Sequence, residues 1–317
     1  MAAPRILVTG ATGMVGSALC RLLHEQGFAV RAAVRCGPQA TPWPSVVTGE
    51  LGSDTDWRVA LEDCQAVVHL AAAVHDQRGR LSEADYWRIN HQATLTLAEQ
   101  SAALGVRRLL LVSTVKIHGE SSIPGQPFRE TDPARPDDAY ARSKWAAEQA
   151  VWQVAEATGL EVVVVRPPLV YGPGVKANFL QLLRWARRGL PLPLGKIHNQ
   201  RSLIGLANLT TFLQRCLTHP DAAGQTFLVA DRETWSTGAL YQALARAQGV
   251  HAPVWPLPRV VLQALLPSTL EQRLCASLAV STDQATQRLG WQPPYSAETQ
   301  LADTVTWYRQ GGRPWPP

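Results

Sequence analysis

The sequence contains no uninterrupted apolar run of the roughly 20 residues that a membrane-spanning helix requires. Its apolar stretches, such as 162–165, soon end at charged or proline residues. Met1 leads directly into a strand-like apolar pattern, without the basic and apolar segments of a secretory signal. We therefore expect a cytoplasmic protein that is not inserted in a membrane.

Cysteine is also scarce, because the five cysteines are far apart and include no Cys-x-x-Cys pair. This spacing favours neither a metal site nor a disulfide framework, and we predict neither. Basic residues outnumber acidic ones by 30 to 25 but are dispersed along the chain. Nucleic-acid-binding proteins concentrate such residues on one face, so we predict no nucleic-acid partner. A net charge of +5 suits an anionic small substrate.

The proportions of charged and hydrophobic residues, 17% and 46%, exclude disorder as the main state. Over the first half of the chain, short apolar runs alternate with helix-like stretches, which indicates parallel strands buried on both faces. We predict an α/β fold with a doubly wound parallel sheet and right-handed crossovers. Its expected strands are 5–9, 29–34, 45–48, 66–71, 108–113 and 161–166, and its expected helices are 15–26, 56–61, 83–104 and 139–158.

The pattern changes after Tyr171, where a Gly-Pro-Gly sequence interrupts the alternation and prolines become frequent. We therefore place a first domain at 1–170 and a smaller C-terminal substrate-binding lobe at 171–317. Within this lobe we expect helices at 203–217 and 237–248 and a strand at 226–230. Segments near 201–230 are expected to return to the first sheet.

Three glycines lie between the first expected strand and the first expected helix. Gly10 permits a tight turn, Gly13 lets the backbone approach a pyrophosphate, and Gly16 lets the helix pack closely. The surrounding strand, turn and helix favour a dinucleotide site in a Rossmann domain over an ordinary glycine turn. The residues of this turn that we expect at the cofactor are Gly10, Thr12, Gly13, Met14, Val15 and Gly16.

The residue after the second expected strand bears on which dinucleotide binds. An acidic residue there would hold the ribose 2′-hydroxyl of NAD, but the chain has Arg35 and no carboxylate from Val30 to Pro38. A guanidinium group can pair with a 2′-phosphate. Arg35 therefore favours NADP or dual use, whereas a solvated Arg35 would leave NAD as the cofactor.

Tyr140 and Lys144 lie one helical turn apart on the same face of an expected helix. With six tyrosines and four lysines in the chain, chance predicts only about 0.1 such pairs. A nearby ammonium group and an oxidised nicotinamide both favour the phenolate, so Tyr140 is a candidate for proton transfer with an alcohol. A hydroxyl at the end of the preceding strand, from Ser113 or Thr114, would orient the substrate oxygen.

Together these motifs resemble the extended short-chain dehydrogenase/reductase family of the NAD-dependent epimerase/dehydratase type. The overall sequence pattern is similar to that of bacterial UDP-sugar 4-epimerases and 4-ketoreductases of surface-polysaccharide pathways. The resemblance runs nearly end to end, and its segments are 9–16, 69–72, Asn90 with the helix after it, 111–119, 140–144, 166–174, 201–209 and 289–296.

The resemblance implies roles for individual residues. Thr114 becomes the catalytic hydroxyl beside Tyr140 and Lys144. Cofactor contacts outside the glycine turn are implied for Arg35, Glu50, Leu51, Leu70, Ala71, Ala72, Asn90, Ser113, Tyr140, Lys144, Pro167 and Val170. Asn178 and Arg201 match positions that hold the diphosphate of a UDP-sugar, and Arg273 is a weaker match for a later arginine. His118, Ser202 and Asn208 depart from the residues usual in the family.

Two further residues are candidates for substrate binding. Lys116 lies two positions after Thr114, so in an extended segment both side chains point to the same side. Lys116 is then within reach of a substrate hydroxyl, acyl group or phosphate, although a solvated lysine is an equal alternative. His75 follows the fourth expected strand, where the family's loop closes over the sugar.

The resemblance implies an NAD(P)-dependent oxidoreductase that acts at C4 of a nucleotide-linked hexose, with a UDP-sugar as the expected substrate. Arg35 slightly favours a 4-ketoreductase that exchanges NADPH, in O-antigen or capsule sugar biosynthesis. The alternative is a UDP-glucose or UDP-N-acetylglucosamine 4-epimerase that retains NAD. A lesser alternative is a non-catalytic redox sensor, although such proteins typically lose the tyrosine or lysine. The helices at 83–104 and 139–158 resemble the family's dimer interface, so we expect a homodimer.

Overall fold

The computed structural model describes residues 3–37, 41–74 and 81–312. A seven-stranded sheet forms its base, with the strand order β3-β2-β1-β4-β5-β6-β9 and parallel pairing throughout. Its strands are β1 (Arg5–Thr9), β2 (Ala29–Val34), β3 (Ser45–Val47), β4 (Cys64–His69), β5 (Arg108–Val112), β6 (Glu161–Arg166) and β9 (Gln225–Leu228). The predicted doubly wound fold is confirmed, because the strand order reverses between β1 and β4.

Helices cover both faces of this sheet, which explains why its strands are apolar without alternation. Along β5, Leu110 packs on one face, whereas Leu109 and Leu111 pack on the other. The first face is covered by α1 (Met14–Glu25), α7 (Leu206–Thr218) and α11 (Asp283–Leu289). The second is covered by α2 (Arg58–Leu61), α4 (Ala93–Ala103) and α5 (Ala139–Thr158). Each face therefore has its own hydrophobic core.

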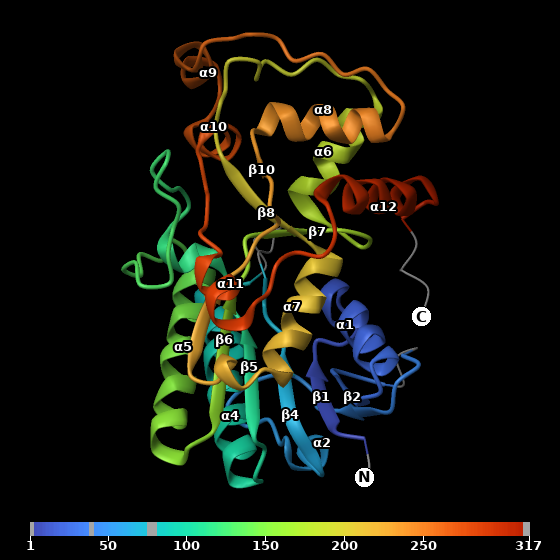
Figure 1. The fold of residues 1–317 in the computed structure, drawn as a ribbon. Coiled ribbons are helices and arrows are strands. Elements are labelled where there is room, and N and C mark those ends of the chain that lie inside the picture. The colour runs from blue at the N-terminus through green and yellow to red at the C-terminus, as the bar shows by residue number, and fades with distance from the viewer. Residues whose placement is uncertain (1–2, 38–40, 75–80, 313–317) are drawn as a thin grey trace.

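A smaller lobe lies above the carboxyl ends of these strands (Figure 1). It contains a three-stranded sheet, β10-β8-β7, formed by β7 (Leu169–Tyr171), β8 (Arg201–Gly205) and β10 (Thr234–Trp235). Its helices are α6 (Ala177–Arg187), α8 (Thr237–Ala247), α9 (Arg259–Leu265), α10 (Ser268–Cys275) and α12 (Ala297–Arg309). A third core, which includes Tyr171, Phe179, Tyr241 and Trp307, joins α6, α8 and α12. No helix in the described part of the chain is long and apolar enough to cross a membrane.

One predicted helix was wrong in part. Residues 201–205 form β8, and α7 begins only at Leu206, so the helix expected at 203–217 covered the end of a strand. The helical stretch expected at 83–104 is confirmed, and it consists of three consecutive segments: α3 (Glu83–Tyr86), a π-helical segment (Trp87–Gln92) and α4. The π-helical segment places Asn90 in a fully buried position.

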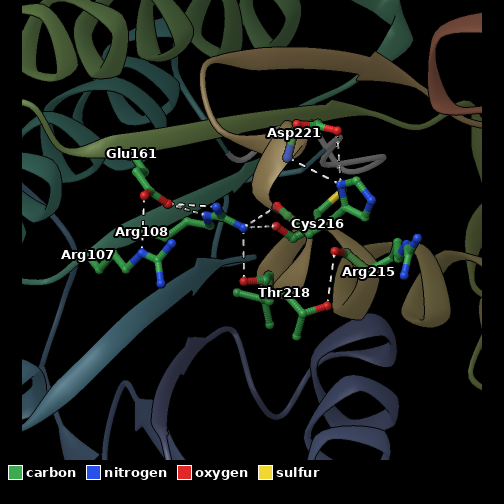
Figure 2. Close-up of polar contacts among 9 residues, drawn as sticks. Arg107, Arg108, Glu161, Arg215, Cys216, Thr218 and Asp221 are labelled. Atoms are coloured by element: carbon green, nitrogen blue, oxygen red, sulfur yellow. Dashed lines mark hydrogen bonds and ion pairs between the residues drawn. The ribbon is translucent and has the colours of Figure 1, made fainter. Parts of the chain in front are cut away.

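Arg108, at the start of β5, connects α7 to the large sheet (Figure 2). Its Nη1 atom donates hydrogen bonds of 2.8–3.0 Å to the carbonyl oxygens of Cys216, Leu217 and His219. Its Nη2 atom lies 2.7 Å from a carboxylate oxygen of Glu161 on β6. The last carbonyls of α7, which have no partners within the helix, are thereby satisfied by a cation.

Candidate active site

The glycine turn between β1 and α1 leaves no room for side chains. A Cβ atom on Gly10 would lie 2.8 Å from the Ala71 nitrogen, and Gly10 has φ of +66°. A Cβ atom on Gly16 would lie 2.1 Å from the Gly10 oxygen. Gly13 occupies the N-cap of α1 and has no side chain to cap the helix amides. The turn therefore presents an open helix N-terminus, which suits a phosphate group.

The backbone beside this turn is held by a buried histidine that the sequence analysis did not single out. His69 Nδ1 lies 2.8 Å from Thr9 Oγ1, which also accepts hydrogen bonds from the Leu70 and Ala71 nitrogens. His69 Nε2 lies 3.0 Å from Thr94 Oγ1. Burial, together with the Lys144 ammonium group, lowers the pKa of His69 to about 3. A neutral imidazole therefore fixes the segment that follows β4.

Asn90 continues this network toward α5. Its Nδ2 atom donates to the Ala73 oxygen and to Ser143 Oγ, at 3.0 Å each, while its Oδ1 atom accepts from the Ala73 nitrogen at 2.7 Å. Ser143 Oγ in turn donates to the Tyr140 carbonyl oxygen at 2.8 Å. The Asn90 amide thus connects the loop after β4 with the helix that carries Tyr140 and Lys144. π-Helical segments occur frequently at functional sites, and Asn90 lies within one.

Tyr140 and Thr114 meet although 26 positions separate them in the sequence. Thr114 follows β5, Tyr140 is the second residue of α5, and their side chains share a hydrogen bond. Burial, followed by the Asp138 carboxylate, raises the pKa of Tyr140 to about 12, although the Thr114 hydrogen bond opposes this shift. In this state the phenol is therefore protonated at neutral pH. Removal of its proton requires additional positive charge beside the ring.

Lys144 lies one turn further along α5 and is 1% exposed. Burial lowers its pKa to about 8, although the Glu148 carboxylate opposes this shift. Glu148 is itself buried and forms a 2.6 Å ion pair with Arg166, whose Nη1 atom lies 2.9 Å from His118 Nε2. Burial, followed by the Arg166 charge, lowers the pKa of His118 to about 4. His118 therefore adds no positive charge to this network at neutral pH.

The expected position of Lys116 was wrong. Residues 115–118 form a 3₁₀ turn, so Lys116 does not continue an extended segment with Thr114. Its Nζ atom lies 2.6 Å from Asp138 Oδ2 and 2.7 Å from Glu120 Oε1. Burial alone would lower the pKa of Lys116, but these two carboxylates raise it above its ordinary value. Lys116 thus fixes Asp138, the N-cap of α5.

The other expected cofactor contacts surround the carboxyl edge of the sheet. Arg35 is exposed directly after β2. Arg88 binds the segment after β3: its Nη1 atom donates to the Leu51 oxygen at 2.7 Å, and its Nη2 atom lies 4.0 Å from Glu50. Pro167 accepts a hydrogen bond from the Val115 nitrogen, and Val170 pairs with Ile204 between β7 and β8.

Two of the residues expected to bind substrate lie in the smaller lobe. Asn178 is exposed in the first turn of α6. Arg201 begins β8, and its Nη1 atom donates to the carbonyl oxygens of Arg273 and Ala276 at 3.1 and 3.0 Å. Burial lowers the pKa of Arg201. His75 lies outside the described residues.

A dinucleotide fits this arrangement on two observations. The glycine turn is a cradle that any Cβ atom at Gly10 or Gly16 would fill. The Ser113 hydroxyl is buried and has no hydrogen-bond partner among the residues that the structure describes. Within the same part of the chain, no group of three His, Cys, Asp or Glu side chains is placed to hold a metal ion.

Comparisons with known proteins agree with this geometry. The model of the NAD dependent epimerase/dehydratase family matches residues 6–230. A UDP-glucose 4-epimerase from Vibrio cholerae is 35% identical over 315 residues, which cover 96% of this chain and 95% of that protein.

Solved structures share the fold over almost the whole chain. The UDP-N-acetylglucosamine 4-epimerase from Bacillus cereus has a TM-score of 0.81 at 18% identity and covers 97% of this chain and 100% of its own. The UDP-glucose 4-epimerase from Thermotoga maritima, solved with UDP-glucose, has a TM-score of 0.78 at 22% identity and covers 97% and 99%. At these identities the likeness concerns the fold alone.

Proposed function

The chain belongs to the NAD-dependent epimerase/dehydratase family, and from that premise we propose that it interconverts the C4 epimers of a UDP-hexose. The observation that carries this proposal is the hydrogen-bonded pair of Tyr140 and Thr114, with Lys144 buried one turn behind. The similarity to the Vibrio cholerae enzyme over nearly its full length supports C4 of a UDP-sugar as the reacting centre.

The residues of this chain would handle the proton and orient the sugar. Tyr140 takes the proton of the C4 hydroxyl and returns it to C4 oxygen after the sugar has presented its other face. Thr114 holds that oxygen during both half-reactions. Lys144 supplies positive charge that favours the phenolate. The nicotinamide ring of a bound dinucleotide would supply the hydride chemistry at C4.

The proposed cofactor is NAD, held through the whole cycle. An epimerase restores its cofactor in each turnover, so tight retention costs it nothing, whereas a reductase must exchange its cofactor. The glycine turn and the buried Ser113 hydroxyl support a dinucleotide. Arg35 supports the second candidate, a 4-ketoreductase that uses NADPH, because a guanidinium group can bind a 2′-phosphate.

The remaining parts of the proposal concern the substrate and the assembly. Asn178 and Arg201 are the proposed contacts of the UDP diphosphate, and both lie in the smaller lobe. The proposed enzyme works in the cytoplasm as a homodimer, with the outer faces of α4 and α5 as the interface.

Product analysis tests the reaction. The purified protein, incubated with UDP-glucose or UDP-N-acetylglucosamine without added cofactor, should yield the C4 epimer, identified by nuclear magnetic resonance. Tyr140→Phe should reduce turnover at least about a hundredfold while cofactor binding persists. Tyr295→Phe, at a tyrosine that is 48% exposed, is the matched control and should leave turnover unchanged.

Two results would contradict these assignments separately. Near-normal turnover of Tyr140→Phe would remove Tyr140 from the mechanism. Reduction of a UDP-4-keto-hexose that occurs only with added NADPH, and no epimer from either UDP-hexose, would make the 4-ketoreductase the better description.

A further inference from the structure

Helix α9 lies at the end of the smaller lobe that is farthest from the large sheet (Figure 1), and exposed apolar side chains gather in and around it. We name residues 255–270 the apolar tip. Of the 14 large hydrophobic side chains that are exposed among the described residues, five lie within these 16 positions. They are Trp255 (58% exposed), Val260 (74%), Val261 (39%), Leu265 (69%) and Leu270 (37%).

Helix α9 is apolar on both its inner and its outer face. On the inner face, Leu262 is 1% exposed and packs with Leu266 against a small core around Leu194 and Ile197. On the outer face, Val261 and Leu265 are one turn apart and both exposed. Apart from Arg259 and the exposed Gln263, every residue of α9 is apolar, and contiguous exposed apolar residues mark interaction surfaces. The outer face of α9 therefore fits a role in which it is covered.

The apolar tip is held in place by an ion pair. Arg259 Nε, at the first residue of α9, lies 2.6 Å from Glu271 Oε1 on α10. Glu271 is buried and is the single acidic residue between Thr234 and Thr282. The apolar tip therefore has no acidic side chain other than the adjacent Glu271, and Glu271 is paired with Arg259.

Positively charged side chains lie beside the apolar tip. Lys196 and Arg259 line one pocket of about 410 Å³ at the base of the tip, together with His198. Lys196 follows Gly195, whose nitrogen donates to the Trp255 oxygen at 2.8 Å. Arg273 is exposed on α10. Apolar groups and cations thus share one end of the molecule.

We propose that the apolar tip docks this protein on the surface of a lipid bilayer that contains anionic lipids. The exposed apolar side chains would enter the headgroup region, while Lys196 and Arg273 bind lipid phosphates. Surface binding of this kind combines apolar burial with attraction to anionic lipids, and tryptophan is favoured at the membrane interface. A second copy is a poorer occupant, because two equally basic tips would repel each other.

Vesicle sedimentation with the full chain tests this proposal. The protein should bind vesicles of phosphatidylglycerol and phosphatidylcholine at low ionic strength, and bind vesicles of phosphatidylcholine alone much more weakly. Added salt should release it. Val260→Ser combined with Leu265→Ser should weaken binding at least about tenfold. Lys196→Ala and Arg273→Ala should each weaken it roughly fivefold, the change for one basic residue at an anionic surface.

The matched control is Val47→Ser combined with Val59→Ser, since those valines are 57% and 64% exposed but lie on the large domain. It should bind vesicles like the unsubstituted protein, and thermal melts establish that both double variants are folded. Absence of binding to anionic vesicles, or an equal loss in tip and control variants, would overturn the proposal. Self-association without vesicles that the tip variant abolishes would instead assign the tip to a second copy.

Discussion

Arg35 is the residue on which the choice of dinucleotide depends. It is exposed immediately after β2, where its guanidinium group can approach the 2′ position of a bound adenosine ribose. Only NADP carries a phosphate there. Arg35→Ala should therefore weaken NADP binding by about 1–3 kcal/mol, the range for hydrogen bonds to charged groups, and leave NAD binding nearly unchanged.

Titration of both dinucleotides, followed by fluorescence or calorimetry, measures these dissociation constants. Arg58→Ala is a control, because Arg58 is exposed and paired with Asp56 away from the glycine turn. The epimerase proposal further expects NAD to copurify with the native protein. Tighter binding of NADP by the native protein, without copurified NAD, would contradict that proposal.

Single residues were predictable where their chemistry is encoded in a short motif. The pairing of Tyr140 with Lys144 follows from a four-residue spacing on one helix. The partners of Lys116 did not follow from sequence, because Asp138 is brought to it by tertiary structure, 22 positions along the chain. His69 stands within the matching segment 69–72, yet its contacts to Thr9 and Thr94 depend on neighbouring elements that meet only in the fold.

At the scale of elements, Arg108 makes a prediction about how α7 is attached. Arg108→Met should lower the free energy of unfolding by about 2–4 kcal/mol, because it leaves three carbonyl groups and the Glu161 carboxylate without a buried cation. Urea unfolding followed by circular dichroism measures the loss.

Arg107→Met is the matched control, since Arg107 pairs with the same Glu161 but is 72% exposed. An exposed ion pair contributes at most about 1 kcal/mol. Burial alone would raise the pKa of Glu161, but hydrogen bonds from Arg108 and then Arg107 hold it below its ordinary value. Equal losses for the two variants would show that the contacts to α7 contribute nothing measurable.

Helices and strands were predicted accurately where a capping residue or a glycine marks their ends. The helix at 139–158 and the strand at 161–166 have the expected bounds, because Asp138 caps one and glycine separates them. The segment from 201 onward was misjudged because both the end of β8 and the start of α7 are apolar and buried. Gly205 marks the boundary for a reason outside its own segment: the Gln300 side chain fills the position of a Cβ atom there.

For the whole molecule, the proposed dimer depends on which helix residues face outward. On these two helices, Leu97, Ala98 and Val154 face the core between the helices and the sheet. Leu95 and Trp152 remain only partly buried. Leu95→Glu should therefore convert a dimer into monomers, because dimerisation would bury its charge without a partner.

Light scattering combined with size-exclusion chromatography measures the assembly. Leu104→Glu is a control on the same stretch of chain, because Leu104 is 48% exposed just after α4. That variant should remain a dimer. A native protein that is monomeric at micromolar concentration would contradict the proposed assembly.

The last helices of the chain do not belong to one lobe. Helix α11 contributes Ala285 and Leu289 to the core beside α1 and α7, whereas α12 contributes Leu301 and Val305 to the core of the smaller lobe. The smaller lobe is therefore not a contiguous cassette that recombination could exchange for that of a relative. Exchanging residues 171–317 as one block would also replace α7 and α11, and with them part of the core of the large sheet.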